Sequence, residues 1–379
     1  MRYAGLNYKT ILVLSQMIGY LLAKFYGIKF ISELKRWGRN KIILLLVGIS
    51  WMAWLCFALV PAPYNAVFLF INGFPLGMLW GVVFSYVEGR RTTDFIGAAL
   101  AVSFIFSSGF VKTVGGWLLL LHISEFWVPF ATGLVFALPL VLFVWLMEKI
   151  PPPDEADKAA RMHREPMLAA DRKKLLRGFL PGLAICIILY SFATIFRDIR
   201  DNFSADMWKE MGYLNQPAIF STTETPITLI VLVLIGSMVL IKNSYKAFML
   251  AHLFIALGFI MAGFSTFFFV QHQLSPIWWM TAVGLGLYMV YIPFNSVFFE
   301  RFIATFRFTG NVGFLIYLAD SFGYLGSVGV LLSKEIFKVK LNWVQFFSNS
   351  VMILSAIGLL LTGLAAWYFK KKKATDCTD

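Results

Sequence analysis

Charged residues are scarce in this sequence: they form 14% of its 379 residues, whereas hydrophobic residues form 59%. A soluble domain of this length carries nearer a quarter charged residues. Apolar stretches of about 18 residues or more recur along the whole chain, and each is long enough to cross a hydrocarbon core of about 30 Å. Because their hydrophobicity is continuous and does not alternate with a period of two, they predict an all-α membrane protein and argue against an outer-membrane barrel.

Cysteine and histidine are also rare, with three and four residues respectively. The cysteines, Cys56, Cys186 and Cys377, have no CxxC spacing, and the histidines have neither HExxH nor another spacing typical of a metal site. The sequence likewise lacks a P-loop and the GxSxG motif of a nucleophilic serine. We therefore expect no metal, no cofactor and no enzymatic activity, and nucleotide hydrolysis is excluded as a source of energy.

The apolar stretches predict about eleven membrane-spanning helices, at 9–31, 42–60, 66–87, 95–121, 126–147, 178–196, 220–241, 246–270, 277–298, 310–332 and 344–369. Five precede and six follow the longest polar connection, which opens with three consecutive prolines, 151–153. Proline cannot continue a helix, so this connection predicts a linker between two helical bundles. We therefore expect an N-terminal bundle (1–147), a linker (148–177) and a C-terminal bundle (178–379) that ends in a short basic tail.

Lysine and arginine gather on one side of the expected helices, which includes the linker, the loop 35–41 and the lysine run 370–373. Since cytoplasmic loops carry the excess of basic residues, this bias predicts a multi-pass protein of the bacterial inner membrane with a cytoplasmic C-terminus. The formal net charge of +13 is explained by the same bias and by attraction to anionic lipid. The lipid bilayer is therefore the expected partner, and nucleic acid is not.

Two segments of the chain, 73–94 and 284–301, resemble each other. Both carry small residues at helical spacing, followed by a serine and then by a glutamate and an arginine. One lies in the third of five expected spans and the other in the fourth of six. The match predicts two parallel repeats of six helices, with one helix absent before residue 9.

Two helical halves around a long central loop resemble the major facilitator superfamily. The run Lys35-Arg36-Trp37-Gly38-Arg39-Asn40-Lys41 is similar to the basic loop between its second and third helices, although Lys35 stands where that motif has an aspartate. The strings GIKFISE (27–33), WGVVFSYVEGRR (80–91) and RDIRDNF (197–203) resemble an uncharacterised bacterial family of facilitator-like membrane proteins, a domain of unknown function. The resemblance implies a facilitator fold that lacks its first helix, so that span 9–31 is helix two.

Four charged residues fall inside the expected spans: Lys24, Lys112, Glu224 and Asp320. Each costs several kcal/mol in the membrane unless it is paired or faces a wet cavity. The resemblance implies that helix two faces helix eleven and that helix five faces helix eight. Lys24 is then expected to meet Asp320, and Lys112 to meet Glu224, at roughly matched depths of about 10–15 Å and about 25 Å from the cytoplasm. Such pairs act as gates between bundles; alternatively they only hold the bundles together, or the lysines snorkel to the nearer interface.

The segment RDIRDN (197–202) is predicted to close the span 178–196 at its non-cytoplasmic end. Arg197 and Asp201 stand four residues apart and are expected to pair on one helix face. With Asp198 they form either an outer gate for a charged solute or a solvated helix end. Arg197 and Lys112 are expected at comparable depth, where together they can hold a carboxylate or a phosphate.

Polar side chains at helical spacing accompany these charges, and Asn295 belongs to one such stripe. Several stripes, one per helix, predict a central aqueous path. The function that we expect is secondary transport of a small solute, an organic anion, driven by a proton or sodium gradient, with Asp320 or Glu224 taking up the proton. Two alternatives stay open: a non-transporting membrane sensor or assembly protein on the same fold, and a lipid-modifying enzyme that uses the RDIRDN segment.

Overall fold

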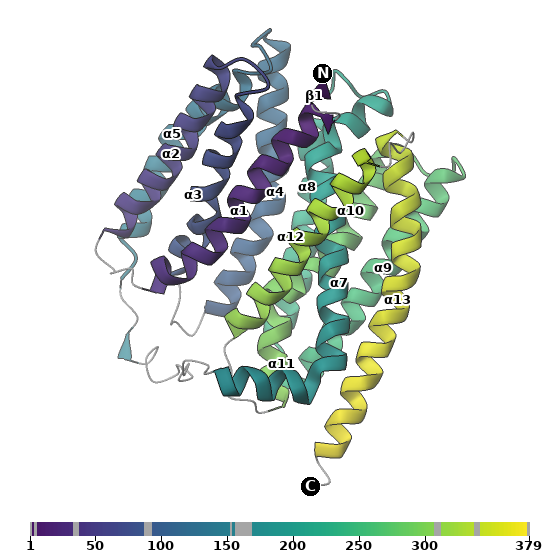
Figure 1. Cartoon of the computed structure of the whole chain (residues 1–379). Coiled ribbons are helices and arrows are strands. Elements are labelled where there is room, and N and C mark those ends of the chain that lie inside the picture. The colour runs from purple at the N-terminus through teal and green to yellow at the C-terminus, as the bar shows by residue number, and fades with distance from the viewer. Residues whose placement is uncertain are drawn as a thin grey trace.

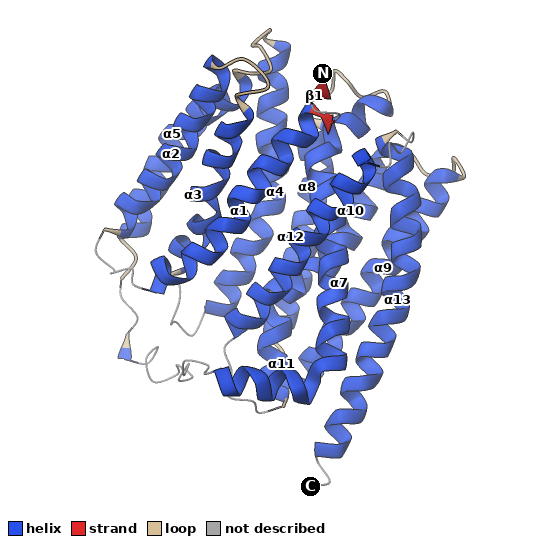
Figure 2. Cartoon of the chain, viewed as in Figure 1, coloured by secondary structure: helices blue, strands red, loops and turns tan. Residues whose placement is uncertain are grey.

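The computed structural model describes residues 2–3, 6–32, 38–86, 93–151, 154–155, 169–306, 312–336 and 342–376. Almost all of these residues are helical, and the only strands among them form a short antiparallel pair, β1 (Arg2–Tyr3) and β2 (Leu6–Asn7), as Figure 2 shows. The prediction of an all-α protein is therefore confirmed.

The helices follow one another along the chain, and the longest connection lies between α5 and α7. The first five are α1 (Tyr8–Ser32), α2 (Arg39–Leu59), α3 (Ala66–Phe84), α4 (Thr93–Leu120) and α5 (Val128–Glu148). The later ones are α7 (Ala169–Glu210), α8 (Ile219–Val239), α9 (Ser244–Val270), α10 (Pro276–Pro293), α11 (Phe299–Thr305), α12 (Val312–Ile336) and α13 (Trp343–Asp376). Between α10 and α11 the chain runs through a π-helical turn, η1 (Phe294–Phe298).

Nine helical segments in the described part of the chain are long and apolar enough to cross a membrane. Two shorter apolar stretches, Tyr8–Ala23 in α1 and Leu318–Ser333 in α12, lie where the sequence predicts two further spans. Most helix bounds lie within a few residues of the expected ones. The chain is a multi-pass membrane protein.

The helices form two groups that stand side by side in Figure 1: α1–α5 (the N-terminal helices) and α7–α13 (the C-terminal helices). Within the first group α3 packs against α1 and α2, and within the second α7 packs against α10, α12 and α13. Between the groups α4 packs along α8, and α1 contacts α12. These are the two pairings that the family resemblance implies, of helix five with helix eight and of helix two with helix eleven.

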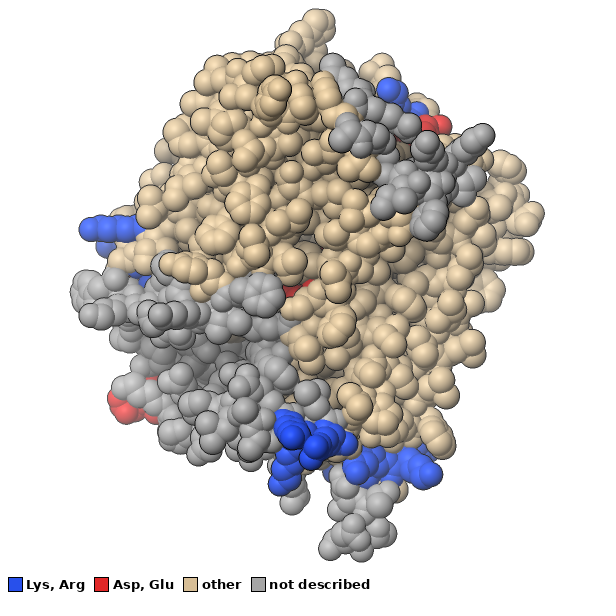
Figure 3. Space-filling model, in the orientation of Figure 1, with Lys and Arg blue, Asp and Glu red and all other residues tan. Residues whose placement is uncertain are grey.

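The two ends of the molecule differ in charge from its middle. The N-terminus lies at the upper end in Figure 1 and the C-terminus at the lower end. On the face drawn in Figure 3, most of the described lysines, arginines, aspartates and glutamates lie toward the upper and lower ends, with one basic group at the left margin, and the tan surface between them is almost free of charge. A small acidic patch shows in the seam between the two groups of helices. The uncharged band has the character of a surface in contact with lipid.

Helix α7 departs most from the sequence prediction. It covers 42 residues, so the expected span 178–196 is only its central part, and the helix begins at Ala169, within the expected linker. Its first turns lie across the lower end of the C-terminal helices, and the rest runs up through them (Figure 1). Pro181, with Gly178 and Gly182 beside it, accounts for the bend, because proline removes a helical hydrogen bond.

Burial separates the central helices from the peripheral ones. In an apolar stretch of 18 residues within Pro276–Thr305, 78% of the residues are buried, against 11% in such a stretch of α5. Helix α5 therefore faces lipid, and α10 lies among other helices. The main hydrophobic core belongs to the C-terminal helices, and Ala98, Val102 and Ile105 of α4 join it. The interface between the two groups thus continues the core of one of them.

Candidate functional site

Four charged side chains, two of them buried and two partly exposed, form an ionic cluster where α4, α7 and α8 meet. Glu224 of α8 accepts a charge-assisted hydrogen bond from Arg200 of α7, with 2.7 Å between Oε1 and Nη1, and these side chains are only 7% and 3% exposed. Lys112 of α4 places its Nζ 3.5 Å from Oδ1 of Asp201. Two positive and two negative charges balance, which is the condition under which charges persist in such an environment.

The ionic cluster keeps unused hydrogen-bonding capacity. Oε2 of Glu224, Oδ1 of Asp201 and Nε of Arg200 are buried and have no hydrogen-bond partner among the described residues. A buried polar atom without a partner costs about 1–3 kcal/mol, and more when it is charged. A proton, a water molecule or a solute can complete the bonding of such atoms.

A second group of side chains lies about one helical turn below the ionic cluster on α7. This tyrosine cluster consists of Arg197, Asp198 and the tyrosines around them, Tyr20, Tyr190, Tyr291 and Tyr324. Asp198 accepts from the Nε and Nη2 atoms of Arg197 at 3.2 and 2.6 Å, and from the hydroxyl of Ser327 at 2.8 Å. The Arg197 guanidinium lies over the ring of Tyr291, 4.0 Å from its centroid. Tyr20 of α1 lies close enough to Arg197 and Asp198 to interact with them electrostatically, so both groups of helices contribute to this cluster.

Asp320 and Asn295 extend the tyrosine cluster toward the lower end. The hydroxyl of Tyr190 on α7 donates a short hydrogen bond to Asp320 of α12, and it also accepts from Nδ2 of Asn295 at 3.2 Å. Asn295 lies in the π-helical turn η1, and this turn begins directly after Pro293. Proline cannot donate to the preceding turn, and π turns are frequent at functional sites because they redirect a side chain.

Two glycines make room for the ionic cluster. A Cβ atom at Gly109 of α4 would lie 2.6 Å from Cγ of Glu224, and one at Gly284 of α10 would lie 2.5 Å from Nη2 of Arg200. Real Cβ atoms do not approach so closely, so a larger residue at either position would displace the charged side chain. The two glycines therefore permit the close approach of α4 to α8 and of α10 to α7.

Polar contacts link the two groups of helices at the upper end. Lys9 of α1 forms an ion pair with Asp206 of α7. Thr113 of α4 lies 2.6 Å from the hydroxyl of Ser221 on α8 and donates to the carbonyl of Pro217 at 3.0 Å. These contacts lie above the ionic cluster, between it and the upper surface.

Several pairings expected from the sequence are wrong. Lys112 pairs with Asp201 and not with Glu224, and Glu224 pairs with Arg200. Arg197 pairs with its neighbour Asp198 and not with Asp201, because the RDIRDN segment lies inside α7 and faces several helices at once. For the same reason the segment is not a solvated helix end.

The expected pair of Lys24 with Asp320 lies partly outside the described residues. Lys24 belongs to α1, but its side chain is not described. Asp320 is buried and bonds to Tyr190. The structure therefore brings Lys112, Arg197, Asp198, Glu224, Asp320 and Asn295 to the seam between the two groups of helices.

Sequence reasoning missed Arg200, the most buried cation of the site. The signal was present, since two Arg-Asp pairs interrupt a long apolar run. The fall in hydropathy at these charges predicts the end of the helix, whereas α7 continues for eight residues beyond Asn202. A helix that continues past such a run must bury its charges against other helices.

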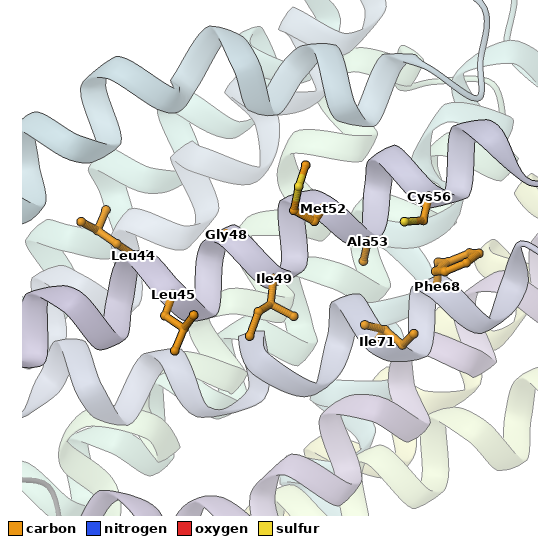
Figure 4. A pocket seen from close by; sticks show the side chains of 9 residues that line it. All are labelled: Leu44, Leu45, Gly48, Ile49, Met52, Ala53, Cys56, Phe68 and Ile71. Carbon is orange, nitrogen blue, oxygen red and sulfur yellow. The ribbon is translucent and has the colours of Figure 1, made fainter.

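An apolar groove lies elsewhere, between α2 and α3 (Figure 4). Its lining residues are aliphatic, aromatic or sulfur-containing, apart from a glycine: Leu44, Leu45, Gly48, Ile49, Met52, Ala53, Cys56, Phe68 and Ile71. No charged or strongly hydrogen-bonding group lines it. It suits a hydrocarbon chain and provides no polar contact for a solute.

Comparison with known proteins places the chain in a family. Residues 1–372 match the model of a family of unknown function, DUF5690. The chain belongs to this family. The sequence resemblance to a facilitator-like domain of unknown function is thereby confirmed, and the match covers the ionic and tyrosine clusters. No curated protein is significantly similar to the chain in sequence.

The fold of this family member is that of major facilitator transporters. The crystal structure of a D-xylose–proton symporter superposes with a TM-score of 0.62 over 95% of this chain and 88% of the symporter, at 16% identity. The crystal structure of the human organic anion transporter MFSD10 superposes with a TM-score of 0.57 over 94% of this chain and 83% of that one, also at 16% identity. At such low identity these matches establish the fold alone.

Proposed function

We propose that the chain is a secondary transporter that moves a small organic anion across the bacterial inner membrane. In this proposal the two bundles, 1–147 and 178–379, rock about the seam between them, so that the tyrosine cluster opens to each side in turn. The linker and the C-terminus are cytoplasmic. The observation that carries the proposal is a buried group of charged side chains at the seam of a transporter fold, where charges are retained for a function because they are costly.

The class of solute follows from the bonds that Arg197 leaves unmade. Asp198 occupies the Nε and Nη2 atoms, which leaves Nη1 to donate to a solute within the described part of the site. Tyr291, Tyr324 and Tyr190 lie close enough to Arg197 to interact electrostatically with it. A guanidinium among tyrosines suits a carboxylate or a phosphate attached to an organic body, because arginine binds planar anions and aromatic rings pack on apolar parts.

The driving force in this proposal is the gradient of a proton or of sodium. The chain has no nucleotide-hydrolysing motif, so an ion gradient is the simplest source of energy. Asp201, Glu224 and Asp320 are buried or half-buried carboxylates at the seam, and each can take up a cation. Neutralising one of them changes the balance of charge that holds the two groups of helices together.

The test measures the thermal stability of the purified full-length protein against panels of anionic, neutral and cationic metabolites. A ligand of the folded state raises the apparent melting temperature. We expect anions to stabilise the wild type and to lose most of that effect in Arg197→Met. Stabilisation by neutral sugars or cations alone, or equal stabilisation by anions in Arg197→Met, would contradict the anion proposal. Uptake of the stabilising anion into proteoliposomes under a pH or sodium gradient then tests transport and identifies the ion.

A further inference from the structure

Glu224 occupies a position in which one carboxylate oxygen is bonded and the other is not. Arg200 donates to Oε1 at 2.7 Å, whereas Oε2 is buried without a hydrogen-bond partner among the described residues. A proton on Oε2 would remove the charge of that orphaned oxygen and turn it into a donor. Oδ1 of Asp201, which faces the ammonium of Lys112 at 3.5 Å but makes no hydrogen bond, is the nearby acceptor.

The surroundings of Glu224 suit a proton better than a sodium ion. The charged and titratable groups that act on it are Arg200 and Asp201 from α7, Lys112 from α4 and Tyr288 from α10. A metal cation is held by several oxygen ligands, whereas one oxygen of Glu224 is already bonded to Arg200 and Asp201 faces Lys112. A proton needs only one oxygen and no coordination shell.

Protonation of Glu224 has a consequence for Arg200. The guanidinium loses its anionic partner, and a buried cation without a partner is strongly unfavourable. Asp201, the next residue along α7, already interacts with Arg200 electrostatically. Arg200 therefore turns toward Asp201 and competes with Lys112, whose own bond to Asp201 is long at 3.5 Å.

Lys112 is the member of the ionic cluster that belongs to the N-terminal helices. Its bond to Asp201 is therefore an ionic link between the two groups of helices, and its loss weakens their contact along α4. We propose that Glu224 is the proton-binding carboxylate of the transport cycle and that its protonation releases Lys112 from Asp201 and unlocks the two groups. This inference rests on the proposed transport function. It adds the residue that binds the proton and the order of events that follows protonation.

The charges balance through the cycle. A proton from water on one side of the membrane adds to Oε2 of Glu224, and the ionic cluster changes from neutral to a charge of +1. The released ammonium of Lys112 and the extra positive charge favour entry of an anion at the neighbouring tyrosine cluster. When the proton leaves to the other side, Arg200 returns to Glu224 and Lys112 to Asp201. The proton is the only species gained and lost by the protein, apart from the solute.

The test follows the distance between the two groups of helices by electron–electron double resonance, with no solute present. Nitroxide labels are placed at Glu125→Cys and Leu214→Cys, two exposed sites in upper-end connections of different groups, after the native cysteines are replaced by serine. Lowering the pH from about 8 to about 5 spans the range in which a perturbed carboxylate titrates. We expect the wild-type distance distribution to move to longer values as the pH falls.

Variants separate the proton site from its effect. Glu224→Gln mimics the protonated form and should show the longer distances at both pH values. Lys112→Met lacks the cation that is released and should do the same. Glu210→Gln is the matched control, because that carboxylate caps the N-terminus of α13 within the C-terminal helices, and it should keep the wild-type response.

Two results would overturn the inference: a wild-type distance that does not change with pH, or a Glu224→Gln variant that keeps the wild-type response. If Glu224→Gln does not fold, Asp201→Asn decides, since it keeps Glu224 but leaves Lys112 without the partner from which it is released. A persisting pH response in Asp201→Asn then contradicts the mechanism. Because no solute is used, failure here is distinct from failure of the anion screen.

Discussion

The ammonium of Lys112 on α4 lies 3.5 Å from the carboxylate of Asp201 on α7 and joins the two groups of helices through a pair of charges. Both side chains are about a quarter exposed, at 27% and 28%. This partial access to solvent makes the pair weaker and easier to exchange than the Arg200–Glu224 pair beside it. A loose pair next to a tight one is the arrangement expected of a link that must open and close.

The pairing of Lys112 predicts the outcome of a double-mutant cycle. Lys112→Met and Asp201→Asn should each lower resistance to unfolding in SDS, and the double variant should lose less than the sum. Coupling between contacting residues lies at about 0.5–3 kcal/mol, and solvent screening places this pair in the lower part of that range. Additive losses, or a larger coupling between Lys112 and Glu224 in the parallel cycle, would contradict the pairing.

The Arg200–Glu224 pair predicts a much larger effect of removing one partner. Arg200→Met leaves Glu224 buried without its cation and should cost about 3–5 kcal/mol. Arg200→Met combined with Glu224→Gln should recover part of that loss, since no unpaired charge then remains. Lys209→Met, at the exposed upper end of α7, is the control and should change stability little. Equal effects of Arg200→Met and Lys209→Met on unfolding in SDS would show that Arg200 is not part of a buried pair.

The close approach of α4 to α8 predicts the effect of a single methyl group. Gly109→Ala places a Cβ atom 2.6 Å from Cγ of Glu224, so that the helices must separate or Glu224 must move, and thermal stability should fall. Gly48→Ala is matched to it as a glycine inside a membrane-spanning helix, but nothing lies within 4 Å of its added Cβ atom. It should be neutral, or stabilising by up to about 1 kcal/mol through helix propensity. Equal melting temperatures of the two variants would contradict the close packing of α4 against α8.

The distribution of basic residues predicts the orientation in the membrane. A cysteine at Glu155, in the connection before α7, should be cytoplasmic, and one at Gln273, between α9 and α10, should be periplasmic. Intact cells treated with a membrane-impermeant maleimide should label Gln273→Cys strongly and Glu155→Cys only after lysis. Equal labelling of the two positions in intact cells would contradict the orientation.

Much of the fold was predictable from the sequence, because continuous hydrophobicity and loop charge depend on the bilayer and not on tertiary detail. The eleven spans and the contacts of α4 with α8 and α1 with α12 follow from it, the contacts with help from the family resemblance. The positions of the charged residues at the seam were also predictable, since Lys112, Glu224 and Asp320 interrupt apolar runs.

The partners of the charged residues could not be predicted. Pairing depends on which of several anions at one depth a side chain reaches, and Lys112 lies near both Asp201 and Glu224. Arg200 was missed because the sequence pattern ended α7 too early. The position of the Asn295 side chain depends on a π-helical turn, and hydropathy and helical spacing do not reveal such a turn.

The central claim is that the tyrosine cluster opens to both sides of the membrane in turn. The most direct measurement is the labelling of Tyr324→Cys by a membrane-impermeant maleimide, in right-side-out and inside-out vesicles, with the native cysteines replaced by serine. Leu138→Cys, whose native side chain is 80% exposed on the lipid-facing helix α5, is the control that should stay unlabelled in both. The account predicts that Tyr324→Cys reacts in both kinds of vesicle, whereas labelling from one side only, or from neither, would contradict transport and favour a membrane protein with a fixed structure.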